Sequence, residues 1–306
     1  MKTRIKKLNA VVAGDARQLA RKATELFVAD AGRAIETSDR FCAAICRRTP
    51  RRFFEILAGQ SRTLRWEKVQ LFWVDECCGP PHVPNHSCSR AARRLISVAG
   101  IPARNVHPIC SDNCNCGHSA WVYEQTIYDM VGSRNDGMPC FDLVMLNMGA
   151  DGHIASLFPD TSAFFDTNRC VRVIYFMDDR YTRITLTNPV LCAASHVVVL
   201  VCGADKAAVL ADMLTTEPDQ VHYPLHTVWP ILDRVTWLLD SSAARFLVRH
   251  GLTQFEVRAL PQSKPYRNFW PLRLSRRTLG RNPSAALNRP AQADAAALSE
   301  KGGDAK

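Results

Sequence analysis

Residues 141–148 constrain the fold of this 306-residue chain more than any other feature. The run is almost continuously apolar and has the length of a strand buried on both faces, which is typical of a parallel sheet. Residues 197–202, Val-Val-Val-Leu-Val-Cys, form a second run of this kind. Amphipathic segments alternate with these runs, and the longest covers residues 15–35, where Asp15 is placed to cap a helix. We therefore predict an α/β fold with a Rossmann-like, mostly parallel sheet and helices on both faces.

The same patterns predict the remaining elements. We expect strands over residues 8–13, 41–46, 69–74, 171–176, 183–187 and 235–239. We expect helices from Thr49-Pro50 to residue 57, with Thr49 as the cap, and over residues 89–99, 120–131, 190–194 and 205–214. Beyond residue 250 the pattern degrades and prolines recur, so we predict one folded domain over residues 1–250 and a basic, disordered tail over residues 251–306.

The net charge of +10 suggests anionic partners, but its distribution is uneven. The tail holds 10 Lys and Arg against 4 Asp and Glu, which leaves only +4 for the first 250 residues. Arginines lie near Phe269 and Trp270 in the tail, a composition that could bind nucleic acid or lipid, although a solvated extension is the simpler interpretation. No apolar run approaches the ~18 residues of a membrane span and none resembles an export signal, so we expect a cytoplasmic protein with no membrane partner. We also expect a monomer without a nucleic-acid partner.

The 12 cysteines lie mainly in apolar or helical stretches, which favours reduced, buried thiols in a protein that is not exported. One cluster leaves an alternative open: Cys110, Cys114, Cys116 and His118 could ligate zinc. The Cys-x-x-Cys spacing of a structural zinc site is absent from it. We therefore expect no metal and no organic cofactor.

A glycine-rich turn follows the buried run at residues 149–152, and His153 comes directly after it. Ligands of open α/β sheets bind beyond the carboxyl ends of the strands, so a histidine here is well placed for proton transfer. Asp151 could orient its imidazole. Residues 154–157 are expected to start a helix. These residues alone fit a catalytic turn and a turn with a solvated histidine equally well.

The stretch over residues 141–160 resembles the signature of the 6-phosphogluconolactonase family. In that family a strand ends in a Gly-x-Asp-Gly-His turn followed by Ala-Ser-Leu-Phe-Pro. The matching residues are Gly149, Asp151, Gly152, His153, Ala155, Ser156, Leu157, Phe158 and Pro159. The related glucosamine-6-phosphate deaminases continue with Phe-Asn-Glu-Pro, so residues 156–159 favour the lactonase branch. Blocks at residues 72–76, 183–191, 201–206 and 224–244 also resemble the family, so the resemblance spans about residues 8–248.

The chain departs from the family where the phosphate should bind. The family's loop after the second strand has glycines that let backbone N–H groups reach the phosphate. Here Cys46 and Arg47 stand in their place, and only Thr49-Pro50 survives. The family usually has Arg where this chain has Cys77, and a glycine where it has Asn147. Arg47 or Arg48 could replace the lost contacts through a guanidinium group, or both could point to solvent.

The resemblance implies hydrolysis of 6-phospho-glucono-1,5-lactone to 6-phosphogluconate in the oxidative pentose phosphate pathway. His153 would be the general base, Asp151 would hold its tautomer, and N–H groups of the turn from Gly149 to Gly152 would steady the oxyanion. The expected substrate-binding residues are Arg47, Arg48, Thr49, Asp75, Glu76, Gly149, Gly152, Arg183 and Lys206.

Two other functions stay open at this point. The altered loop and Cys77 are compatible with a degenerate relative that binds a sugar phosphate or a protein without turnover. An aminosugar-phosphate deaminase or isomerase is the weaker alternative, because residues 156–159 argue against it.

Overall fold

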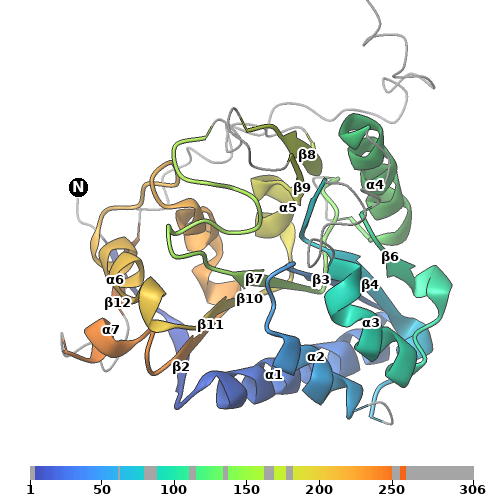
Figure 1. The fold of residues 1–306 in the computed structure, drawn as a ribbon, viewed down its shortest axis with the longest axis horizontal. Helices are drawn as coiled ribbons and strands as arrows, with labels where there is room; N and C mark the ends of the chain where they lie inside the picture. Colours follow the sequence, from blue (N-terminus) through green and yellow to red (C-terminus); the bar gives the residue numbers. More distant parts are fainter. Residues whose placement is uncertain are drawn as a thin grey trace, which may run out of the picture. The chain divides into compact units, whose positions relative to one another are not determined.

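A seven-stranded parallel sheet forms the centre of the protein in the computed structural model (Figure 1). The structure describes residues 4–60, 63–78, 88–109, 115–133, 137–161, 169–176, 182–249 and 256–259. All of these belong to one unit, residues 1–271. The strands in spatial order are β2 (Asn9–Ala13), β11 (Val235–Asp240), β10 (His196–Val201), β7 (Leu143–Asn147), β3 (Phe41–Ile45), β4 (Val69–Trp73) and β6 (Val106–His107).

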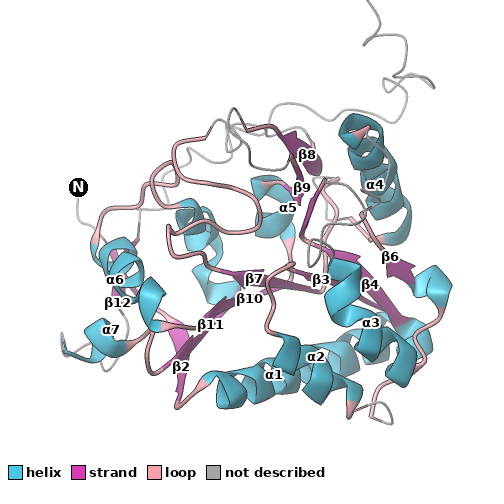
Figure 2. Cartoon of the chain, viewed as in Figure 1, coloured by secondary structure: helices cyan, strands magenta, loops and turns pink. Residues whose placement is uncertain are grey.

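Every neighbouring pair in this sheet is parallel, as predicted. The central strands β3, β7 and β10 are buried almost throughout, because helices cover both faces. In Figure 2 the helices α1 (Ala16–Ser38), α2 (Arg51–Ala58) and α3 (Cys88–Ala99) lie on one side, and α4 (Cys116–Met130) and α5 (Asn188–Ala193) on the other.

Helix α1 shows how the sequence sets a boundary. The Asp15 carboxylate accepts a hydrogen bond from the Gln18 N–H at 2.7 Å, and the helix ends where Asp39 adopts a left-handed conformation. Its apolar face brings the Phe27 ring to 5.2 Å from Phe41 and 6.0 Å from Phe53, measured between centroids. The remaining helices are α6 (Ala207–Thr215), α7 (Arg245–Arg249) and the 3-10 helices η1 (Trp66–Lys68), η2 (Ala103–Asn105), η4 (Ala204–Lys206) and η5 (Pro224–Arg234).

A smaller antiparallel sheet stands beside the main one, with strands β5 (Asp75–Cys77), β9 (Arg183–Leu186) and β8 (Val171–Ile174). The Leu186 N–H donates to the Val74 carbonyl at 2.8 Å, which ties this sheet to the end of β4. Strand β5 was not predicted, because three residues after β4 are too few for a periodic pattern. Strand β12 (Glu256–Ala259) pairs with β1 (Arg4–Lys7) and lies within the segment expected to be disordered; the rest of that segment is outside the described residues.

Two local expectations were wrong. Thr49 does not cap α2: Pro50 occupies that position without a side-chain hydrogen bond, because the Thr49 N–H closes a turn onto the Cys46 carbonyl and its hydroxyl is buried without a hydrogen-bond partner. Residues 154–157 do not start a helix. Ile154 forms bridges with Met148 and Leu157, and Ala155 takes a left-handed φ of 52°, so this segment is a compact turn.

The order of the strands places a crevice between β3 and β7. The chain continues from β3 to β4 on one side and from β7 to β10 on the other. Loops leaving two adjacent strands in opposite directions open a space at their carboxyl ends, where ligands of such sheets bind. None of the helices over the described ranges combines the length and apolarity needed to cross a bilayer.

Candidate active site

A cavity of about 260 Å³ lies at the carboxyl ends of β3, β4, β7 and β10. It is therefore at the point where the chain reverses its direction along the sheet. The cavity is lined by Cys46, Arg47, Arg48, Asp75, Asn147, Met148, Gly149, Ala150, His153, Ala155, Asp205 and Lys206.

His153 lies in the wall of this cavity, and its ring is held by Asp151. The distance from Nδ1 of His153 to Oδ1 of Asp151 is 2.5 Å. Partial burial alone would raise the pKa of the Asp151 carboxyl, but the hydrogen bond and charge of His153 outweigh it and lower the pKa to about 2. Asp151 is therefore a carboxylate that accepts a hydrogen bond from the Nδ1–H group of His153, which leaves the lone pair of Nε2 for chemistry.

The turn that carries His153 depends on two glycines. A Cβ atom on Gly149 would collide with the His153 ring and with the Asp151 carboxylate, so only glycine allows this approach. Gly152 has a φ of 84°, which side chains disfavour. The Gly149 N–H donates to the His153 carbonyl at 2.8 Å and the Gly152 N–H to the Gly149 carbonyl at 3.1 Å. These two N–H groups stabilise the turn itself and are not directed at a substrate.

The loop after β3 is closed by its own hydrogen bonds. The Arg47 N–H donates to Oδ1 of Asp75 at 3.1 Å, and the Thr49 N–H donates to the Cys46 carbonyl at 3.0 Å. The backbone of Arg48 and of Asn147 favours the thiolate form of Cys46, but these contributions to its pKa are the smaller ones. Burial, and then the charge of Asp75, raise the pKa of the Cys46 thiol, so it is neutral at physiological pH. Unlike a glycine-rich phosphate loop, this loop therefore directs its N–H groups inward.

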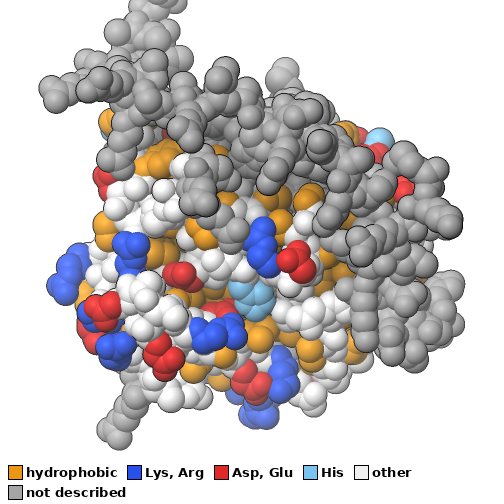
Figure 3. Space-filling view, turned by 180° about the vertical axis from the view of Figure 1, so that it is seen from behind, with side chains coloured by type: hydrophobic (Ala, Val, Ile, Leu, Met, Phe, Trp, Pro, Cys, Tyr) orange, Lys and Arg blue, Asp and Glu red, His pale blue; other side chains and the backbone are white. Residues whose placement is uncertain are grey.

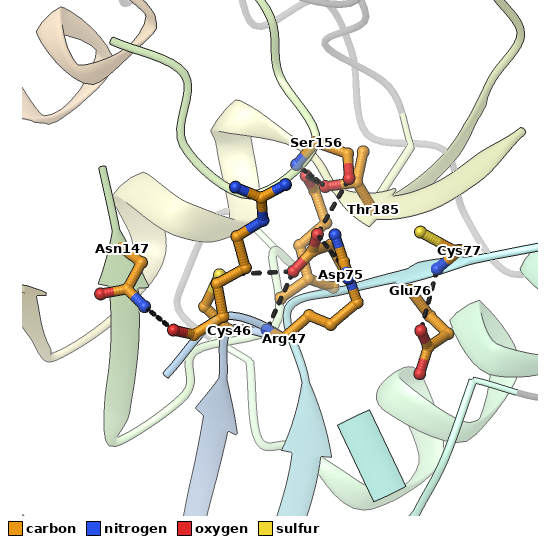
Figure 4. Close-up of polar contacts among 10 residues, drawn as sticks. Cys46, Arg47, Asp75, Glu76, Cys77, Asn147, Ser156 and Thr185 are labelled. Atoms are coloured by element: carbon orange, nitrogen blue, oxygen red, sulfur yellow. Dashed lines mark hydrogen bonds and ion pairs between the residues drawn. The ribbon is translucent and has the colours of Figure 1, made fainter. Parts of the chain in front are cut away.

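Asp75 is the centre of the network that holds this loop (Figure 4). Its side chain is almost fully buried. Oδ2 accepts a hydrogen bond from the Ser156 hydroxyl at 2.9 Å and lies 3.9 Å from Nε of Arg47. The Cys46 thiol lies 3.4 Å from Oδ1. Asp75 therefore joins the loop after β3 to the turn after β7, and it partly neutralises Arg47.

Arg48 and Lys206 carry the charge that remains available in the cavity. Arg48 is exposed and Lys206 half-buried, and neither forms an ion pair with a carboxylate of the described ranges. They lie on the loops after β3 and β10, which flank β7 on both sides. Elsewhere on the described surface, basic and acidic side chains are intermixed on the face shown in Figure 3. Arg48 and Lys206 therefore bring positive charge to both sides of the end of β7.

The chain matches a family model over residues 14–237, described as glucosamine-6-phosphate isomerases/6-phosphogluconolactonase. The chain belongs to this family. A 6-phosphogluconolactonase of Nostoc sp. is 34% identical to it over 230 residues, which cover 75% of this chain and 94% of the relative.

Solved structures agree with this assignment. The crystal structure of the 6-phosphogluconolactonase from Leishmania guyanensis superimposes with a TM-score of 0.65 at 27% identity and covers 78% of this chain and 98% of that one. A monomeric glucosamine-6-phosphate deaminase superimposes with a TM-score of 0.64 at 17% identity, covering 78% of this chain and 99% of that one. The latter likeness shows the shared fold alone.

The structure brings about half of the expected site residues to the cavity. Its lining includes Arg47, Arg48, Asp75, Gly149, His153 and Lys206. Glu76 is not among them, since consecutive strand residues face opposite sides and its carboxylate accepts the Cys77 N–H at 2.9 Å. Thr49, Asp151, Gly152 and Arg183 are also outside the lining of this cavity.

The sequence marked Asn147 only as a departure from the family pattern and did not count it among the substrate-binding residues. Its amide lines the cavity and donates to the Arg48 carbonyl, which fastens the loop after β3 to β7. A polar residue inside an otherwise apolar strand was the available signal. The zinc alternative stays untested, because Cys110 and Cys114 lie outside the described residues.

Gly149→Ala tests whether the close approach of the turn to the imidazole is required. The added methyl group would displace the ring from Asp151, so we expect a mixture of His153 tautomers, measured by ¹⁵N NMR of the imidazole, in place of one Nδ1-protonated form. Gly32→Ala in α1 is the matched control, since its methyl group would meet no atom within 4 Å. An unchanged His153 spectrum in Gly149→Ala would contradict the geometry.

Proposed function

We propose that this protein hydrolyses 6-phospho-glucono-1,5-lactone to 6-phosphogluconate, a step of the oxidative pentose phosphate pathway. One observation carries the proposal: a histidine held by a carboxylate shares a cavity of about 260 Å³ with two cations that have no carboxylate partner among the described residues. The relatives named 6-phosphogluconolactonase support the choice of substrate.

His153 acts as the general base. Asp151 holds the proton on Nδ1, so Nε2 removes a proton from water as the water oxygen attacks the lactone carbonyl carbon. The bond between that carbon and the ring oxygen then breaks. The imidazolium returns its proton to the departing oxygen, which becomes a hydroxyl group, and the carbonyl carbon becomes a carboxylic acid, which loses its proton to solvent and leaves as the carboxylate. A lactone is an activated ester, so base assistance of ~10²–10⁴-fold serves this reaction without a metal or organic cofactor.

The negative oxygen of the intermediate requires a hydrogen-bond donor. The N–H groups of Gly149 and Gly152, expected to serve here, are engaged within the turn. Ala150 lines the cavity, and its N–H has no acceptor among the described residues. We therefore assign this role to the Ala150 N–H.

The phosphate end of the substrate binds to side chains. Because the N–H groups of Arg47 and Thr49 donate to protein acceptors, neither of them is available to a phosphate. Arg48 and Lys206 supply the charge, and Asp75 and Asn147 hold the loop that presents Arg48. A guanidinium group thus replaces the backbone contacts to phosphate that glycines allow in the family's usual loop.

The cytoplasmic location and the monomeric state of the protein remain predictions.

His153→Ala should reduce lactone hydrolysis by about 10²–10⁴-fold, because the general base is lost. The measurement is proton release by purified protein, corrected for spontaneous hydrolysis. His118→Ala removes an exposed histidine of α4 and should leave the rate unchanged. Wild-type activity no faster than the spontaneous reaction would refute the enzyme and favour a sugar-phosphate binder.

Arg48→Ala should weaken substrate binding about 10- to 100-fold, since a charge-assisted hydrogen bond contributes about 1.5–3 kcal/mol. Arg48→Lys should recover part of this, because it keeps the charge but not the planar fork. The measurement is KM together with the dissociation constant of inorganic phosphate. Arg51→Ala, which removes the same charge from an exposed residue paired with Glu55, is the control. Equal effects of Arg48→Ala and Arg51→Ala would show that Arg48 makes no direct contact.

A further inference from the structure

Phe158 lies flat against the imidazole of His153. The ring centroids are 4.4 Å apart and the planes meet at 28°. The edge of this imidazole is hydrogen-bonded to Asp151, whose side chain is half exposed. An edge contact fixes the direction of Nδ1, whereas a flat contact with a second ring fixes the plane of the imidazole, and with it the direction of Nε2.

The Phe158 ring is itself firmly placed. The Leu157 N–H donates to the Ile154 carbonyl at 2.8 Å, and the Thr161 hydroxyl donates to the Phe158 carbonyl at 2.8 Å. The edge of Phe176 packs on the Phe158 ring at 5.2 Å between centroids and an angle of 86°. The ring can therefore serve as a rigid support.

The same ring supports a cation. The guanidinium carbon of Arg183 lies 5.5 Å from the centroid of Phe158. Nε of Arg183 is buried and has no hydrogen-bond partner in the described part of the chain. Arg183 is therefore seated on an aromatic face and not on a carboxylate. Arg183 does not line the cavity, but it is close enough to Arg47 and Arg48 for the three positive charges to repel one another. Arg183 therefore adds to the positive charge beside the cavity.

We propose that Phe158 is a positioning residue that fixes the plane of the His153 imidazole and seats Arg183. Phe158 is outside the lining of the cavity, so it acts through these two residues and not on the substrate. Displacing a reacting group by about 1 Å can cost on the order of 10²-fold in rate. Loss of the aromatic face should therefore reduce turnover much more than substrate binding. This inference rests on the proposed lactone hydrolysis.

The kinetic test compares four variants. Phe158→Leu should lower kcat about 10- to 100-fold with a much smaller change in KM, and Phe158→Tyr, which keeps the ring, should restore most of the rate. Phe158→Met fills similar space without a planar face, so it should also lower kcat, and it replaces Phe158→Leu in the test if that variant folds poorly. Phe246→Leu is the control and should keep kcat near the wild-type value, because it removes a ring of α7 that also carries an arginine guanidinium, that of Arg245, but does not line the cavity. Rates are measured well below each melting temperature.

A second readout does not require activity. In the wild-type protein the ¹⁵N spectrum of His153 should show one Nδ1-protonated tautomer, and in Phe158→Leu a mixture, while Phe246→Leu should match the wild type. Unchanged kcat and an unchanged tautomer in both Phe158→Leu and Phe158→Met would overturn the inference. A different outcome is possible: the wild-type protein has no lactonase activity, but the His153 tautomer still changes in Phe158→Leu. That result would refute the proposed function and leave the positioning role intact.

Discussion

The parallel pairing of β3 with β7 is the constraint on which the rest of the site depends. The Cys46 N–H donates to the Met145 carbonyl at 3.0 Å, and the Asn147 amide donates to the Arg48 carbonyl 99 positions away in the sequence. The two strands end at the same edge of the sheet, and the chain leaves them in opposite directions. The crevice that results is lined by His153, which follows β7, and by Arg48, which follows β3.

The buried carboxylate of Asp75 makes the altered loop possible. A buried charge is stable only when hydrogen bonds and opposite charges surround it. Here the Arg47 N–H and the Ser156 hydroxyl donate to the two carboxylate oxygens, and the Arg47 side chain lies beside them. Cys46 and Arg47 are thus accommodated where family members have glycines. On the proposed function, the consequence is that the phosphate is recognised by side chains in place of backbone N–H groups.

Much of the architecture could be predicted from the sequence because its signals are local and strong. The apolar runs ending at Met148 and Cys202 gave two central strands within one or two residues of their bounds. The cap at Asp15 marked the start of α1. Strand β5 and the turn over residues 154–157 could not be predicted, because their conformation is set by partners such as Thr185, which lie far away in the sequence.

The site was predicted less completely for the same reason. Family motifs located His153, Asp151 and Lys206, but no motif says which N–H groups are already engaged. Gly149 and Gly152 serve the turn, and Arg183 rests on Phe158 outside the cavity. Asn147 and Phe158 gain their roles from contacts that only the folded chain creates.

The central claim is that His153 and the Arg48–Lys206 pair bind opposite ends of one phosphorylated sugar acid. The most direct test is a crystal structure of the protein with the product, 6-phosphogluconate. The account predicts the phosphate between the side chains of Arg48 and Lys206, and the carboxylate within hydrogen-bond distance of Nε2 of His153 and near the Ala150 N–H. A phosphate held by the backbone of residues 46–49, or a carboxylate remote from His153, would contradict it.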